Sequence, residues 1–344
     1  MPIPVEVVFN PNWWLQNCGI AFDESFYFDR QRRIENDVTM RRTLYGRFGI
    51  GEPDPEPRPI VGSMHVAGGF VVPALLGLEI RFSPHDAPWP VTRELNREEI
   101  FALRVPELET TWPMNRLIAD MDALEKEFGR VMGDFNTDGV LNTALQLRGQ
   151  RLFLDMMEDP ELAGRLFAIV AETQARVASY VRSRTGTCSV AVNRSILNVN
   201  PSIYLHGNCS VQMVSPALFE RALLPWEQYL AGKLAPYGIH HCGHNLHLFA
   251  ACYAKVPPAF CDVGWGSDIG KCSRGLPDTF LNLRLSPVKL MRQTAAAVRE
   301  DVARLLAEAD RRGNVGLCAI NMDHGTPDEN VAAIFEAARA FSAD

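Results

Sequence analysis

The sequence of 344 residues has no run of the roughly 18 to 20 uncharged apolar residues that a membrane-spanning helix needs. Residues 1–12 also lack the basic segment followed by an apolar segment that marks a secretory leader. Basic residues are not in excess, since 34 Lys and Arg stand against 41 Asp and Glu and the net charge is −7. We therefore expect a cytoplasmic protein with neither a membrane nor a nucleic acid as its partner.

Two motifs of common cofactor and metal sites are also missing. No Gly-x-Gly-x-x-Gly follows an expected strand, which disfavours an open dinucleotide-binding sheet. No Cys-x-x-Cys pair is present to build a closed structural zinc site. The eight cysteines are too few for a disulfide scaffold in a chain of this length, and we expect most of them to be small buried residues.

What the chain does contain, from about residue 60 onward, is an alternation of short apolar runs and longer helical patterns. The expected strands are 60–64, 131–135, 188–193, 237–242, 260–264, 280–284 and 315–319. The expected helices are 115–128, 160–184, 216–234, 247–256, 287–312 and 328–341. Such an alternation predicts parallel βαβ units, and eight of these units close into a single (β/α)8 TIM barrel.

The first 59 residues follow a different pattern from the rest of the chain. They mix aromatic and charged residues and end in a segment with alternate prolines, which can form neither a helix nor a central strand. We expect an N-terminal helical extension with a proline-rich strap over 1–59 and a barrel over 60–344. The tryptophans Trp13, Trp14 and Trp265 form either an aromatic wall for a flat substrate or the hydrophobic contact between the extension and the barrel.

The densest group of chemically active residues lies at the end of the expected strand 237–242. His240 and Cys242 are two residues apart, so a strand directs their imidazole and thiol to one side and His241 to the other. The C-terminal ends of strands are where a barrel carries its active site. Cys318, at the end of another expected strand, would supply the third ligand of a catalytic zinc site with one open position. The alternative is that these are buried strand residues.

Polar or aromatic residues that follow other expected strands could bind substrate at the mouth of the barrel, or simply cap its loops. These candidates are His65, Asp134, Asn136, Asn198, Asn208, Asp262 and Trp265. His324 and Cys209 are further candidates near the metal site, with plain burial as the alternative for Cys209.

The segment His240-His241-Cys242-Gly243, together with Cys318, resembles the H-x-C…C signature of the zinc-dependent corrinoid methyltransferase branch of the uroporphyrinogen decarboxylase superfamily. The resemblance covers most of the chain. Segment 207–216 is similar to the stretch that leads into this signature, 281–287 lies where the superfamily has G-N-x-D-P, and 326–330 resembles its closing T-P-x-E-N. It implies a TIM barrel with a zinc ion held by His240, Cys242 and Cys318. It also implies a corrinoid on a separate protein, because this chain lacks the Asp-x-His-x-x-Gly pattern of corrinoid-carrying domains.

The function that this resemblance implies is methyl transfer between a small methylated substrate and the cobalt of a transiently bound corrinoid protein. O-demethylation of a methoxylated aromatic fits best, because an open zinc position would stabilise the phenolate that leaves. Transfer from a methyl-corrinoid to a thiol or folate carrier is the alternative within this class. A cofactor-free decarboxylase is disfavoured, since 12–19 lacks the decarboxylases' P-x-W-x-M-R-Q-A-G-R motif and no arginine cluster is evident in the barrel strands. A non-catalytic zinc- or corrinoid-binding module would need no open coordination position.

Overall fold

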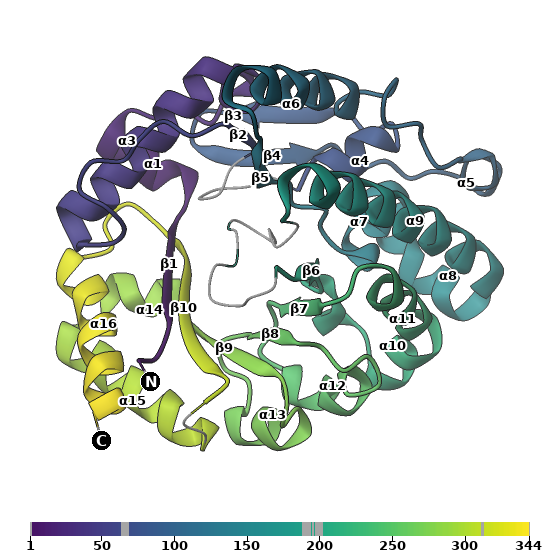
Figure 1. Cartoon of the computed structure of the whole chain (residues 1–344). Coiled ribbons are helices and arrows are strands. Elements are labelled where there is room, and N and C mark those ends of the chain that lie inside the picture. Colours follow the sequence, from purple (N-terminus) through teal and green to yellow (C-terminus); the bar gives the residue numbers. More distant parts are fainter. Residues whose placement is uncertain are drawn as a thin grey trace.

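The computed structural model describes residues 2–62, 69–187, 194, 196, 202–310 and 313–343. Its strands stand around a common centre and its helices cover them from outside, which is the arrangement of a TIM barrel (Figure 1). This confirms the fold class expected from the alternation of strands and helices. No helix of the described residues combines the length and the apolar composition that crossing a membrane requires.

Parallel pairing joins most strands of the barrel. The largest sheet has six strands in the order β1-β10-β9-β8-β7-β6, and β2 pairs in parallel with β5 in a second sheet. A separate antiparallel hairpin consists of β3 and β4. The strands are β1 (Val5–Phe9), β2 (Ile60–Gly62), β3 (Ile80–Ser83), β4 (Asp86–Pro90), β5 (Met132–Asp134), β6 (Tyr204–Gly207), β7 (Tyr237–His241), β8 (Phe260–Val263), β9 (Phe280–Leu285) and β10 (Val315–Met322).

Helices precede, connect and follow these strands. In the N-terminal half they are α1 (Pro11–Cys18), α2 (Glu24–Phe28), α3 (Arg30–Phe48), α4 (Val71–Leu75), α5 (Arg97–Ala102), α6 (Met114–Phe128), α7 (Val140–Arg148), the 3₁₀ turn η1 (Gly149–Arg151), α8 (Leu152–Glu158) and α9 (Pro160–Thr185). In the C-terminal half they are the 3₁₀ turn η2 (Ser210–Met213), α10 (Pro216–Ala222), α11 (Leu224–Lys233), α12 (Leu246–Tyr253), α13 (Ile269–Gly275), α14 (Pro287–Arg292), α15 (Ala295–Ala309) and α16 (Asp328–Ala343).

The longest helix, α9, shows how the local sequence sets these bounds. The side chain of Asp159 accepts a hydrogen bond from the backbone of Leu162, and Pro160 occupies the first turn, where its missing N–H costs nothing. Gly186 ends the helix in the left-handed conformation. Between these ends, one apolar face of α9 is buried in the main hydrophobic core.

Two helices that the sequence predicts as continuous are interrupted. The expected helix 216–234 breaks after α10, because Pro225 has no N–H to donate and sits in the first turn of a new helix, α11. The expected helix 287–312 breaks where the hydroxyl of Thr294 caps a second helix, α15. The expected strand 188–193 lies outside the described residues.

The segment before residue 60 contributes to the barrel as well as to its helical cover. Strand β1 was not predicted, and it pairs in parallel with β10 in the main sheet. Trp13 and Trp14 are each 1 % exposed, and the ring of Trp13 stacks on Phe9 of β1 with 4.1 Å between the centroids. Of the two roles considered for these tryptophans, the structure supports hydrophobic packing between α1 and the barrel.

Candidate metal centre

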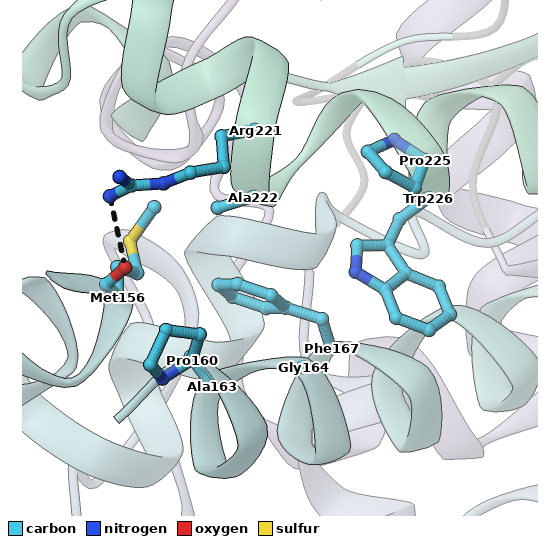
Figure 2. Close-up of a pocket in the computed structure, with 9 residues that line it drawn as sticks. All are labelled: Met156, Pro160, Ala163, Gly164, Phe167, Arg221, Ala222, Pro225 and Trp226. Atoms are coloured by element: carbon cyan, nitrogen blue, oxygen red, sulfur yellow. Dashed lines mark hydrogen bonds between the residues drawn. The ribbon is translucent and has the colours of Figure 1, made fainter. Parts of the chain in front are cut away.

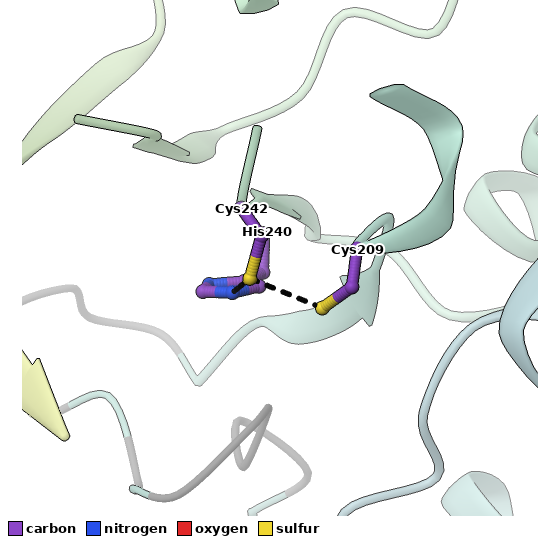
Figure 3. A group of neighbouring side chains, drawn as sticks. All are labelled: Cys209, His240 and Cys242. Atoms are coloured by element: carbon purple, nitrogen blue, oxygen red, sulfur yellow. Dashed lines mark hydrogen bonds between the residues drawn. The ribbon is translucent and has the colours of Figure 1, made fainter. Parts of the chain in front are cut away.

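Three side chains that bind transition metals converge at the C-terminal ends of two neighbouring strands. The thiols of Cys209 and Cys242 and the imidazole of His240 lie with their ligand atoms within 4.8 Å of one another. The two sulfur atoms are 3.2 Å apart, and Nε2 of His240 is 2.9 Å from the sulfur of Cys242. Figure 3 shows these side chains pointing toward one another. We call Cys209, His240 and Cys242 the thiol–imidazole cluster.

The register of β6 and β7 brings the cluster together. Gly207 is paired with His240, so the chain that continues from β6 places Cys209 beside Cys242, two residues further along each strand. Within β7, His240 points toward the cluster, whereas His241 points the other way and is hydrogen-bonded to Tyr253 and Asn245. The strand periodicity that predicts opposite directions for His240 and His241 therefore matches their contacts.

A buried carboxylate on the next strand orients the imidazole. Asp262 of β8 lies with one oxygen 2.6 Å from Nδ1 of His240, which leaves Nε2 free to face the sulfur atoms. The other oxygen of Asp262 accepts hydrogen bonds from Arg194, at 2.6 Å, and from Asn282, at 3.0 Å. Both of these donors also bind Glu6 of β1. The side chain expected to bind substrate at position 262 is thus a support for His240.

The charges of these groups depend on one another. The hydrogen bond from Cys209 holds the pKa of Cys242 well below its usual value, and the charge of His240 acts in the same direction. That hydrogen bond, together with burial, raises the pKa of the Cys209 thiol well above its usual value. Burial alone would lower the pKa of His240, but the negative charges of Cys242 and Asp262 outweigh it and raise this pKa. The cluster therefore favours one thiolate beside a protonated imidazole.

The donor set fits a zinc ion. Two thiols and one imidazole are zinc ligands, and three protein ligands leave the open position that distinguishes catalytic from structural sites. A carboxylate behind the ligating histidine is the usual partner of such a site, and Asp262 provides it. Metal binding would release the remaining protons of the cluster, because only deprotonated thiols and neutral imidazole are ligands.

Cys318, which the sequence analysis proposed as the third ligand, is not among the side chains that the structure gathers here. Its sulfur lies 3.8 Å from Oδ1 of Asp262, whereas His240 contacts Oδ2 of the same carboxylate. The reason is strand order, since β10 and β7 are separated by β9 and β8, whereas β6 is the direct neighbour of β7. Cys209, considered only as a further candidate near the metal site, takes the place expected for Cys318.

Two of the candidates on the N-terminal side of the barrel form local hydrogen bonds. Asp134 accepts hydrogen bonds from the backbone of Phe135 and from Thr187, and Asn136 accepts one from the backbone of Asp138. His65 and Asn198 lie outside the described residues.

The candidates that follow β6, β8 and β10 are not members of the cluster. Asn208 is 2 % exposed and donates to Glu227 and Tyr253. Trp265 is 48 % exposed after β8. His324 is exposed after β10, where its ring lies 3.5 Å from Asn17 of α1.

Two residues near the cluster were missed by the sequence analysis. Asp138, after β5, has a φ of 61° and receives hydrogen bonds from Asn142 and Gln146, and burial raises its pKa to about 6. Arg284 of β9 is 5 % exposed, and its positive charge interacts with Cys242. The signal for Arg284 was present, because Asn282 and Arg284 alternate with leucines in β9, as inward-facing polar residues of a barrel do.

A cavity of about 220 Å³ lies elsewhere, in the outer layer of helices (Figure 2). Phe167 and Trp226 form much of its apolar lining, and Arg221 at its edge donates to the carbonyl of Met156. The lining comes from α8, α9, α10 and α11 and includes no residue of the thiol–imidazole cluster. This cavity is therefore separate from the candidate metal centre.

The fold and the site define a TIM barrel with a candidate metal-binding group at the C-terminal ends of its strands. Residues 66–341 match the uroporphyrinogen decarboxylase (URO-D) family, and the chain belongs to that family. Among solved structures, it is similar to a methyltransferase from Methanosarcina mazei, with a TM-score of 0.67 and 15 % sequence identity over 99 % of this chain and 94 % of that one. At this identity the likeness concerns the fold. A comparison with curated protein sequences found no match.

Proposed function

We propose that this protein is a zinc-dependent methyltransferase that moves a methyl group between a small methylated substrate and the cobalt of a separate corrinoid protein. The observation that carries the proposal is the thiol–imidazole cluster with Asp262 behind His240. The name of the structural neighbour, a methyltransferase, supports the same class of reaction. We further propose Cys209, His240 and Cys242 as the zinc ligands.

Asp262 and the residues of the cluster have different roles at such a site. Asp262 keeps the Nδ1 proton of His240, so that the Nε2 lone pair is available to the metal. Cys242 is the thiol that loses its proton first, and the Cys209 thiol stabilises it by a hydrogen bond. Zinc, when bound, would act as a Lewis acid on the oxygen, nitrogen or sulfur that carries or receives the methyl group.

The corrinoid protein would dock at the end of the barrel where the cluster lies. Three large apolar side chains follow the C-terminal ends of successive strands in this part of the chain and are about half exposed. They are Met213 after β6, Leu248 after β7 and Trp265 after β8. Exposed apolar side chains are typical of surfaces that bind a partner protein, and these three follow strands that carry the cluster or Asp262. A methoxylated aromatic stays our first choice of substrate, with a thiol or folate carrier as the alternative acceptor.

Decarboxylation, the reaction for which the family is named, is the second candidate. The buried Arg284 favours it, because a decarboxylase must bind an acidic substrate. Among the described residues, Arg194 is the other arginine inside the barrel. It is already paired with Glu6 and Asp262. One guanidinium beside two thiols and an imidazole fits metal-assisted methyl transfer better than decarboxylation of a substrate with many carboxylates.

The test follows the absorbance of cobalamin, which changes when its cobalt is methylated. Zinc-loaded protein is mixed with reduced cobalamin and a panel of methoxylated aromatics, methylamines and methylated thiols, and formation of methyl-cobalamin is followed by its absorbance. We expect methylation with one class of donor, and its loss in Cys242→Ala. The matched control is Cys252→Ala, which removes a buried cysteine outside the cluster. Release of carbon dioxide from acidic substrates without methyl transfer would favour the second candidate instead.

A further inference from the structure

Arg284 differs from the other buried arginines of the described residues. Those arginines, Arg33, Arg148 and Arg194, each form an ion pair with a carboxylate, at 3.1, 2.7 and 2.6 Å. Arg284 is just as buried, at 5 % exposed, yet no carboxylate of the described residues lies within 4.0 Å of it. Its Nε also has no hydrogen-bond partner there.

A buried guanidinium without a carboxylate partner is costly. Arginine is almost never buried unless it is paired, and leaving a buried charge uncompensated costs several kcal/mol. The side chain stays charged, as arginine does in proteins. The Cys242 sulfur compensates part of this charge through a hydrogen bond with the guanidinium, but no carboxylate of the described residues forms an ion pair with it.

Its position in the barrel directs Arg284 toward the candidate metal centre. On β9, Asn282 faces the interior and donates to Asp262 and Glu6, and Arg284 lies two residues closer to the C-terminal end on the same face. The register pairs Arg284 with Cys318 on β10. On its other side, its charge interacts with the sulfur of Cys242. The guanidinium of Arg284, with its unpaired Nε, thus lies next to the thiol–imidazole cluster.

We propose that Arg284 binds a carboxylate of the substrate and so positions the atom that exchanges the methyl group at the open coordination site. The inference rests on the proposed function and adds a substrate class to it: a methylated compound, or a methyl acceptor, that carries a carboxylate. The planar guanidinium suits a carboxylate because it donates two parallel hydrogen bonds. The rival explanation is that Arg284 only balances the charge of the thiolates.

The experiment uses bifunctional probes on protein loaded with cobalt(II) in place of zinc. Mercaptoacetate, 3-mercaptopropionate and 4-mercaptobutyrate each offer a thiol for the metal and a carboxylate for Arg284. The alcohol of the same length is the neutral control for each acid. Binding is measured from the sulfur-to-cobalt absorption band. We expect at least one acid to bind about tenfold or more tightly than its alcohol, since hydrogen bonds to charged groups are the strong ones.

Arg284→Gln should abolish this preference while the cobalt content stays unchanged. The matched control is Arg292→Gln, on the exposed end of α14, which should keep the preference. Equal binding of every acid and its alcohol to the wild type, or a preference that survives in Arg284→Gln, would overturn the inference. Because the first comparison needs only the wild type, it stands even if the variant fails to fold. If none of the mercapto acids and alcohols perturbs the cobalt spectrum, or if no cobalt binds, the proposed function fails, and the inference fails with it.

Discussion

His240 and Asp262 lie on neighbouring strands of the barrel, with Nδ1 of the imidazole 2.6 Å from a carboxylate oxygen. Both side chains are fully buried, so this contact is fixed by the register of β7 and β8. Since Asp262 also accepts hydrogen bonds from Arg194 and Asn282, one carboxylate links the thiol–imidazole cluster to the charged interior of the barrel. Such a support is expected to tune how well His240 binds a metal.

Asp262→Asn should therefore weaken metal binding. Loss of a carboxylate behind a ligating histidine typically reduces metal affinity about 10- to 100-fold. The measurement is competition for zinc with a chromophoric chelator. Asp155→Asn is the matched control, because Asp155 is another buried aspartate that is paired with an arginine, Arg148, but lies outside the cluster. The expectation is contradicted if Asp262→Asn binds zinc as tightly as the wild type and the Asp155→Asn control do.

Asp138 should make stability depend on pH. Its pKa is about 6 in the folded protein, against a usual value of 3.8, because burial disfavours the charged form. The carboxyl group therefore contributes stability that is fully present below pH 3.8 and is lost as the pH rises through about 6. The amide of asparagine does not ionise, so Asp138→Asn should not lose stability over this pH range. Asparagine also tolerates the left-handed φ of 61°.

We expect the free energy of unfolding of Asp138→Asn, relative to wild type, to rise by up to about 3 kcal/mol between pH 4 and pH 7. Urea unfolding at several pH values measures it. Asp310→Asn is the control, because Asp310 shares a left-handed φ, of 50°, but is exposed at the end of α15. A difference between Asp138→Asn and wild type that stays constant over this range would show that the carboxyl group does not titrate as inferred.

Gly139 permits the close approach of two chain segments beneath the cluster. A Cβ atom at this position would lie 1.7 Å from the carbonyl oxygen of Gly207, the last residue of β6. Gly139→Ala must displace that strand end, which leads directly to Cys209. We expect it to lower the free energy of unfolding by about 1 to 3 kcal/mol or more and to weaken zinc binding.

Gly164→Ala is the matched control for this substitution. Gly164 lies within α9, and a Cβ atom there would meet nothing within 4 Å. Alanine should therefore stabilise the helix, by about 0.5 to 1 kcal/mol. Urea unfolding of both variants compares the two effects, and the steric argument fails if Gly139→Ala is as stable as the wild type.

The alternation of side chains along a strand was enough to predict how His240, His241 and Cys242 are directed. It predicts that His240 and Cys242 face one side and His241 the other, because side chains alternate along every strand. It also placed the cluster at the C-terminal ends of strands once a barrel was inferred. These inferences depend only on local sequence.

The third side chain of the cluster depends on which strands are neighbours, and this information is not local. Strand β6 has only four residues, all of them buried, and it was not recognised. Without β6, Cys209 had no expected place beside Cys242, and Cys318 was the available cysteine at a strand end. The pairing of Gly207 with His240 resolves the choice in favour of Cys209 as the cysteine that lies beside Cys242.

If Cys209, His240 and Cys242 hold a zinc ion, elemental analysis of the purified protein will detect it. The protein is purified without a metal-chelating resin, and zinc per chain is measured in the wild type and in Cys209→Ala, Cys242→Ala and Cys318→Ala. We predict about one zinc per chain in the wild type and in Cys318→Ala, and a clear loss in the other two variants. A wild type without zinc, or a Cys209→Ala variant that retains zinc while Cys318→Ala loses it, would show that these three side chains are not the zinc ligands.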